Sequence, residues 1–274
     1  MNRIGFFMAG LLVLVAAHSA SAGISSDLAN ATILEEFLFD DANGTLFTAA
    51  ANNVTSHLWD EDADTLDVAT NGSGQLNASL KNNLQFGTNY VDNDLISAAP
   101  GLRVLGVMEL TWDFQSALDA TENEELRISL MQNDPRSTFV VAEWEISRED
   151  DDTLIIFGNG VGTGSSNTAT ALLNGGSLTQ SAKFIAVVDA NMHTSTYEIH
   201  YSNDAGANFT TLGGGLLDPT RNTVEGFRMV LNNNLNIDNV LIDRAYLATV
   251  IPEPTSLVLT ALAVIGLAAR RRRQ

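Results

Sequence analysis

The sequence of 274 residues contains no cysteine, which excludes disulfides, thiolate catalysis and cysteine-ligated zinc. Basic residues are also scarce, with 14 Lys and Arg against 33 Asp and Glu. Segments 1–22 and 252–274 hold five of the basic residues and one of the acidic ones, so the body between them has nine basic and 32 acidic residues, a net charge of −23. Because such a body repels phosphate groups, the composition argues against nucleic-acid binding.

The body also lacks long helical periodicity and internal repeats, which argues against a solenoid or propeller. The best helix signal is a short piece at 28–38. Elsewhere apolar and polar residues alternate, as in 103–114, where Val104, Met108 and Trp112 share one face. We predict strands at 103–114, 126–130, 139–148, 153–157, 183–189, 196–202, 208–212, 225–232 and 236–249.

Many short strands separated by Gly, Asn and Asp turns predict an all-β protein, an antiparallel two-sheet β-sandwich. We expect one sandwich domain at 23–251, with its core at about 33–249. The Gly-rich stretch 158–180 is predicted to be a long loop. It lacks the glycine order and following helix of a phosphate-binding loop.

Residues 1–22 have the three parts of a secretory signal peptide. Arg3 supplies the positive charge, 4–17 is apolar, and Ala20 and Ala22 are small residues at the cleavage positions. We expect signal peptidase and the export machinery to leave a mature chain that begins at Gly23. The alternative is a permanent N-terminal anchor.

The C-terminal segment 252–274 also has three parts. Pro252, Glu253 and Pro254 are followed by an apolar stretch, 257–269, and then by four arginines that predict a cytoplasmic stop. The arginines are Arg270, Arg271, Arg272 and Arg273. The apolar helix would be roughly 20 Å long, so the arginine side chains would have to extend to the membrane interface.

This tail closely resembles the PEP-CTERM sorting signal of Gram-negative bacteria. The resemblance implies recognition by an exosortase and cleavage near Pro252-Glu253-Pro254. It also implies that the exported chain is anchored in the inner membrane at first, and then released to the cell surface or an exopolysaccharide matrix. A plain C-terminal membrane anchor is the alternative.

The body resembles concanavalin A-like and laminin-G-like jelly-roll sandwiches, on the pattern of 183–212 and the closing strand at 236–249. The resemblance implies that carbohydrate binding, for example to exopolysaccharide, is an alternative to a passive surface or matrix role. It also raises the question of a glycoside hydrolase, in which two carboxylates flank the scissile bond.

The nearest text to a laminarinase motif is at Glu143 and Glu145, but the middle acid is not Asp and the last position holds Arg148. We expect these glutamates to lie on the solvent side of a strand. We therefore expect no catalytic residues, and predict an exported surface or matrix protein that is not an enzyme.

Asp60, Asp62 and Asp64 resemble the beginning of a calcium loop. The EF-hand pattern fails, because Thr65 and Asn71 stand where Gly and Glu are needed. A solvated turn and a looser calcium site both remain, and calcium is the one cofactor that the sequence suggests.

Two other patterns predict structure rather than chemistry. Residues 202–209 resemble the Asp-box hairpin of sialidases, which is a structural turn. The histidines His57, His193 and His200 show no spacing typical of metal ligands.

Overall fold

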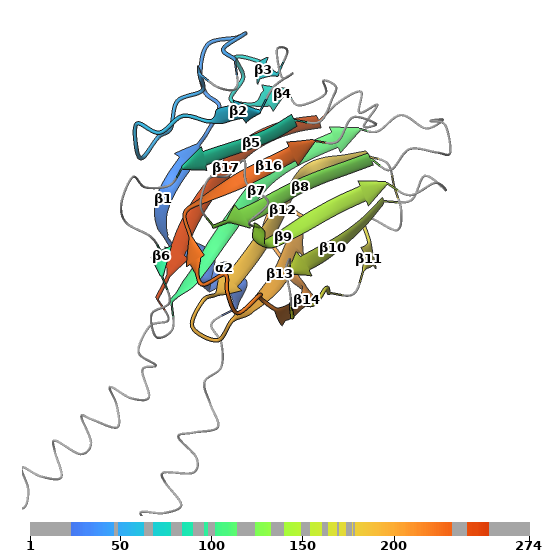
Figure 1. Ribbon diagram of the computed structural model, residues 1–274. Helices are drawn as coiled ribbons and strands as arrows, with labels where there is room; N and C mark the ends of the chain where they lie inside the picture. Colours follow the sequence, from blue (N-terminus) through green and yellow to red (C-terminus); the bar gives the residue numbers. More distant parts are fainter. Residues whose placement is uncertain are drawn as a thin grey trace, which may run out of the picture.

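Two antiparallel sheets packed face to face form most of the described part of the chain, as a computed structural model shows (Figure 1). The structure describes residues 23–46, 49–62, 68–77, 84–89, 96–97, 102–113, 124–132, 140–148, 154–160, 164–168, 170–173, 177, 179–231 and 240–251. The predicted all-β, antiparallel two-sheet sandwich is confirmed.

The first sheet contains both the first and the last strand of the sandwich. Its order is β14 (Thr210–Leu216), β13 (Thr196–Ser202), β12 (Thr179–Asn191), β7 (Arg103–Asp113), β17 (Val240–Val250), β4 (Leu76–Asn77) and β3 (Ala69–Thr70), with β1 (Thr32–Phe37) also paired to β17. Since β7 and β17 are neighbours, segments far apart in the sequence lie side by side at the centre of this sheet.

The second sheet is built mostly from the middle of the chain. Its order is β11 (Ala171–Leu172), β10 (Leu154–Gly160), β9 (Val140–Arg148), β8 (Glu124–Met131), β16 (Gly226–Leu231), β5 (Leu84–Asn89) and β2 (Asp60–Asp62). A separate two-stranded piece pairs β15 (Thr223–Val224) with β6 (Ile96–Ser97). All nine predicted strands are present, with ends shifted by a few residues.

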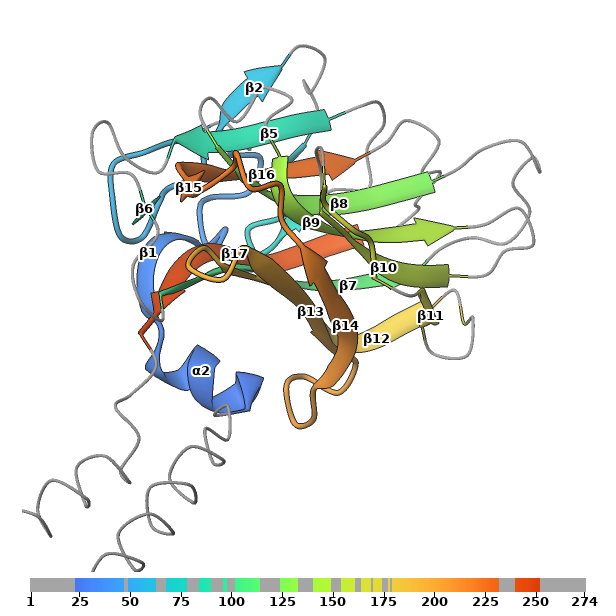
Figure 2. The same cartoon turned by 60° about the horizontal axis from the view of Figure 1, so that its bottom comes forward.

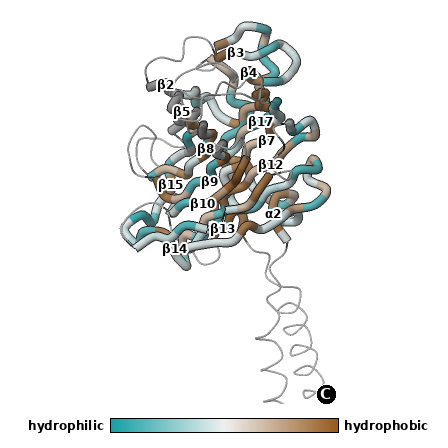
Figure 3. Tube along the Cα trace, turned by 90° about the vertical axis from the view of Figure 1, so that its right-hand side faces the viewer, coloured by the Kyte–Doolittle hydropathy of each residue, from teal (hydrophilic) through white to brown (hydrophobic). Residues whose placement is uncertain are grey.

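Apolar side chains fill the space between the sheets. On β7, Val104, Met108 and Trp112 all point into this core, as their alternation predicts. Figure 3 shows the hydrophobic segments running through the strands, while hydrophilic residues gather in the turns. Burial of this interior is the main favourable contribution to the stability of a chain without disulfides.

The outer face of the first sheet carries a second, smaller apolar cluster. Leu105 and Val107 of β7 lie there with Val187 of β12 and Tyr246 of β17. The helix α2 (Ile24–Asn30) covers this cluster through Ile24, beneath the curved sheet in Figure 2. The helix therefore explains why β7 is apolar on both faces.

The predicted helix at 28–38 is wrong in its extent. The helix ends at Asn30, Ala31 is extended, and β1 begins at Thr32. Pairing with β17 decides the conformation of this segment, because it aligns Phe37 with Ala245 and buries the Phe37 ring in the core. Such a tertiary contact overrides a weak local helix signal.

The predicted loop at 158–180 is wrong in its extent, because β10 continues to Gly160, β11 occupies Ala171–Leu172 and β12 begins at Thr179. A Cβ atom on Gly160 would lie 2.6 Å from the carbonyl oxygen of Leu216 and 2.8 Å from the ring of Tyr197. The Tyr197 hydroxyl donates hydrogen bonds to the carbonyl oxygens of Gly158 and Ser166. Glycine is thus required by the close approach of neighbouring backbone and the Tyr197 ring.

The two ends of the described chain lie close together. Ile24, which follows the expected mature terminus, shares the outer apolar cluster with Val250 at the end of β17. Among the described residues the structure has no helix that is long and apolar enough to cross a membrane. The apolar stretches at 4–17 and 257–269 lie outside those residues.

Candidate functional site

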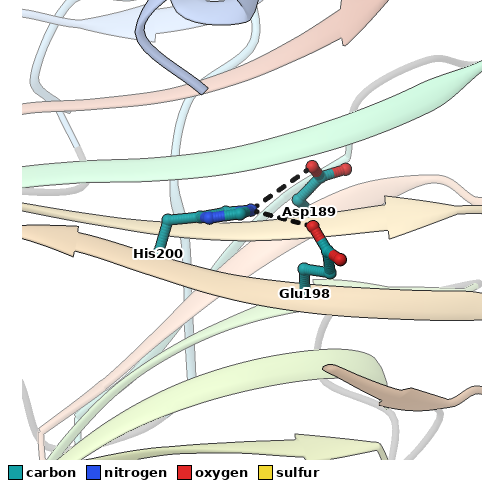
Figure 4. Close-up of side chains that lie close together, drawn as sticks. All are labelled: Asp189, Glu198 and His200. Carbon is teal, nitrogen blue, oxygen red and sulfur yellow. Dashed lines mark ion pairs between the residues drawn. The ribbon is translucent and has the colours of Figure 1, made fainter. Parts of the chain in front are cut away.

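A cluster of three ionisable side chains lies on the outer face of the first sheet. Antiparallel pairing of β12 with β13 sets Asp189 directly opposite Glu198. His200 is two residues beyond Glu198, so strand alternation places both on the same face. Figure 4 shows the His200 ring pointing toward both carboxylates.

The His200 ring is held in one orientation. Its Nδ1 atom lies 2.9 Å from the Thr211 hydroxyl on β14. Its Nε2 atom lies 3.5 Å from an oxygen of Glu198 and 3.7 Å from an oxygen of Asp189. The sequence pattern gave no metal spacing for His200, because its partners come from neighbouring positions across strands.

A partly buried guanidinium fixes Asp189 from the other side. Arg103 of β7 donates from Nε to both carboxylate oxygens at 3.0 Å, and from Nη2 to one of them. Its Nη1 donates to Asp27 of α2 at 2.6 Å. Arg103 therefore joins the helix to the sheet.

The same contacts keep the Asp189 carboxylate ionised. Burial alone would raise the pKa of Asp189, but its interactions with His200 and Arg103 outweigh burial and lower the pKa below its ordinary value. The pKa of Arg103 is raised, because its bonds to Asp189 and Asp27 outweigh the burial that would lower it. Both groups are charged at neutral pH.

A second polar network lies on the outer face of the second sheet. Glu143 of β9 accepts hydrogen bonds from Ser129 Oγ at 2.8 Å and from Asn159 Nδ2 at 3.2 Å. Glu145 lies 3.0 Å from the Nε atom of Arg127 on β8. These side chains bring carboxylate, guanidinium, hydroxyl and amide groups together on one sheet face.

The expectation that Glu143 and Glu145 face solvent is wrong. Only 2% of Glu143 and 4% of Glu145 is exposed. Arg228 of β16 is also buried on this face. Its pKa is lowered by burial and by the positive charge of Arg127, and these effects outweigh the negative charge of Glu143, which raises it. The glutamates tolerate burial because arginines and hydrogen bonds compensate their charge.

The remaining sequence-predicted sites lie at or beyond the limits of the described chain. Asp60 and Asp62 belong to β2, at the edge of the second sheet beside β5, while Asp64 lies outside the described residues. Ala20 and Ala22 also lie outside, and Gly23 caps the start of α2. Outside too are the motif Pro252, Glu253 and Pro254 and the arginines Arg270, Arg271, Arg272 and Arg273.

The turn at 202–209 is a structural hairpin, as predicted. The Ser202 hydroxyl donates to Asp204 at 2.7 Å, and both the backbone and the side chain of Asn208 donate to the Asp204 carboxylate. Gly206 has a φ of +87°, which suits glycine. The hydrogen bonds from Ser202 and Asn208 lower the pKa of Asp204 to about 2.

Asp204 predicts how stability depends on acid pH. An unfolded Asp has a pKa of about 3.9, so a lowered folded-state pKa stabilises the fold above pH ~3.9 and this contribution is lost as the pH falls toward 2. Asp189 acts in the same direction. The urea concentration at the midpoint of unfolding should therefore decrease as the pH is lowered from about 4 to 2. Asp204→Asn should make this decrease smaller. A midpoint that stays constant or rises over this range would contradict this assignment.

Comparison with known proteins supports two conclusions about the chain. Residues 250–273 match the PEP-CTERM protein-sorting motif. The endo-1,3-beta-glucanase from Streptomyces sioyaensis aligns over 82% of this chain and 98% of its own, with 10% identity and a TM-score of 0.54. The Ca²⁺-bound exoplasmic/lumenal domain of VIP36 aligns over 83% and 95%, with 7% identity and a TM-score of 0.51. No curated protein sequence matches the chain.

The body therefore shares the two-sheet antiparallel β-sandwich fold of these structures. The chain as a whole joins this sandwich to a C-terminal PEP-CTERM sorting motif. At identities of 10% and 7% the structural likeness concerns the fold, and not the activity of either neighbour.

Proposed function

We propose that this chain is an exported bacterial surface or matrix protein without catalytic activity, sorted by an exosortase at Pro252-Glu253-Pro254. The observation that carries the proposal is the PEP-CTERM match at 250–273, which begins where the last strand ends. The match supports surface or matrix delivery because such a motif implies cleavage by an exosortase. The signal peptide at 1–22 supplies export.

The position of the motif fits this processing. Strand β17 pairs with β7, β4 and β1, so it is central to the first sheet and must remain in the mature protein. Ile251, the next residue, is 74% exposed. Cleavage just beyond it would remove the tail without removing any strand of the sandwich.

The neighbouring chain ends fit delivery across one membrane. Ile24 and Val250 share one apolar cluster, so the expected signal-peptide junction and the sorting motif both adjoin the same region of the sandwich. A chain held by both ends during export would therefore fold with both junctions on the membrane side. Release at each junction leaves the sandwich free.

The sorting hypothesis is tested by cell fractionation in the native host. We expect wild-type protein at the cell surface or in the matrix, and accumulation in the inner membrane when the exosortase gene is deleted. A chain with Pro252, Glu253 and Pro254 all replaced by alanine should accumulate in the same way. Pro219→Ala, in an exposed turn, is the matched control and should sort normally.

Unchanged surface delivery of the triple-alanine chain would contradict exosortase sorting. Equal retention of the Pro219→Ala chain would also contradict it, because the defect would then lie in folding rather than in the motif.

The absence of catalysis is part of the proposal. Glu143 and Glu145 are buried and compensated by neighbouring arginine, serine and asparagine side chains. The next outward position of β9, Ser147, has no carboxyl group to protonate a leaving group. We expect no turnover of β-glucans by the wild-type chain. Turnover that is lost in Glu145→Gln would overturn this part of the proposal.

Polysaccharide binding is a second candidate function, favoured by the partly exposed members of the polar network on the outer face of the second sheet, Arg127 and Asn159. Guanidinium and amide groups of this kind hydrogen-bond sugar hydroxyls. A glycan array with and without calcium separates this role from a passive matrix role. Binding to a polysaccharide would support the second candidate, and binding lost on removal of calcium would also support a calcium site, such as that predicted at Asp60, Asp62 and Asp64.

A further inference from the structure

His200 has an unusual environment for a buried histidine. The residue is only 4% exposed, and within the described part of the chain its Nε2 atom has no hydrogen-bond partner. Its other ring nitrogen is within hydrogen-bond distance of the Thr211 hydroxyl. A buried polar atom without a partner is costly, so the structure calls for a ligand at Nε2.

The atoms around Nε2 indicate what kind of ligand this is. The nearest oxygens of Glu198 and Asp189 are 3.5 Å and 3.7 Å away, within ion-pair distance but longer than the usual distance of about 2.7–3.2 Å for a hydrogen bond. With metal–ligand distances of about 2.1 Å, two ligands of one tetrahedral ion are roughly 3.4 Å apart. One ligand atom from each of the three residues fits within a span of 4.8 Å.

The local charge also favours a cation. Asp27 and Asp189 share the Arg103 guanidinium, and Glu198 lies beside His200 without a pairing to Arg103, so three carboxylates and one guanidinium leave a formal charge of −2 when His200 is neutral. A divalent ion would neutralise this charge. Arg103 would then act as an outer partner that orients the Asp189 carboxylate, as carboxylate ligands of metals commonly require.

We propose that Asp189, Glu198 and His200 bind one divalent transition-metal ion, with Zn²⁺ as the best fit. The imidazole nitrogen favours zinc over calcium and magnesium, which prefer oxygen ligands. Thr211 accepts the Nδ1 proton and so directs the Nε2 lone pair to the ion. This site is separate from the calcium site predicted at Asp60, Asp62 and Asp64.

The exposure of the ligands leaves one side of the site open. Asp189 and His200 are buried, whereas the Glu198 side chain is 58% exposed. Three protein ligands leave a fourth position of a tetrahedral ion for water or an oxygen of a bound molecule. Binding would also order the Glu198 side chain against the sheet.

Calorimetric titration of the EDTA-stripped full-length chain with ZnCl₂ tests the site. We expect one zinc ion to bind per chain. In His200→Ala the affinity for zinc should fall by about 100-fold or more. Thr211→Val should lose about 10- to 100-fold, the usual effect of removing an outer partner of a ligand. His193→Ala, an exposed histidine in the turn between β12 and β13, is the matched control and should bind as wild type.

Circular dichroism and melting curves verify that each variant is folded. Zinc should raise the melting temperature of wild type and His193→Ala, but not of His200→Ala. The proposal is overturned if zinc does not bind below millimolar concentration, or if folded His200→Ala binds as tightly as wild type. It is also overturned if ¹⁵N spectra show a proton on His200 Nε2 at saturating zinc.

Discussion

Replacing Arg103 with methionine should lower the free energy of unfolding by about 3–5 kcal/mol, the usual effect of breaking a buried ion pair. Methionine keeps most of the apolar volume but removes the guanidinium that joins Asp27 to Asp189. Both carboxylates are buried and would lose their shared cation. Urea denaturation at neutral pH measures this loss.

Lys183→Met is the matched control for this substitution. Lys183 pairs with Glu109 at 2.8 Å on the same sheet face, but its side chain is 40% exposed. Exposed pairs contribute little, so the cost should stay below about 1 kcal/mol. If Arg103→Met costs no more than Lys183→Met, Arg103 does not link the helix to the sheet in the way described.

Replacing Trp144 with alanine should have an equally large effect. The indole is fully buried between the sheets, on β9, which lies between β8 and β10. Removing a buried aromatic side chain costs about 3–5 kcal/mol, because a cavity remains. Equilibrium unfolding in urea, with the slope compared between variants, is the appropriate measurement.

Trp144→Phe separates the contribution of the apolar ring from that of the indole N–H group. Within the described residues, the indole Nε1 is buried without a hydrogen-bond partner. Phenylalanine keeps most of the apolar contact and removes this donor, whose burial costs about 1–3 kcal/mol. We therefore expect a loss of only about 1–2 kcal/mol. A loss as large as that of Trp144→Ala would show that the N–H group is satisfied in solution.

The strands of the sandwich could be predicted because alternation survives in the sequence. On β13, Tyr197 and Ile199 face the core while Glu198 and His200 face outward, and the sequence alone shows this pattern. The segment at β1 could not be assigned, because its strand conformation depends on pairing with β17. Local sequence contains no information about a partner more than 200 residues away.

The candidate metal site escaped sequence analysis for a related reason. Glu198 and His200 are visible as neighbours on one strand face, but Asp189 joins them only through the register of β12 against β13. Thr211 and Arg103 come from two further strands. The signal for this site in the sequence was limited to Glu198 and His200, which alternate along one predicted strand of a hairpin.

The sequence also did not predict that side chains on the outer sheet faces are buried. Alternation placed Glu143 and Glu145 on the outer face correctly, and the inference that this face is solvated was wrong. The arginines that compensate them, Arg127 and Arg228, lie on β8 and β16, which flank one another only in the folded sheet. The sorting tail, by contrast, is contiguous, and so could be recognised directly.

Intact-mass measurement of the mature protein from the native host tests the central claim most directly. The account predicts a chain that begins at Gly23 and lacks the residues after about 254, whether alone or joined to another surface molecule. Full-length protein that retains 252–274 in the inner membrane would contradict exosortase sorting of this sandwich.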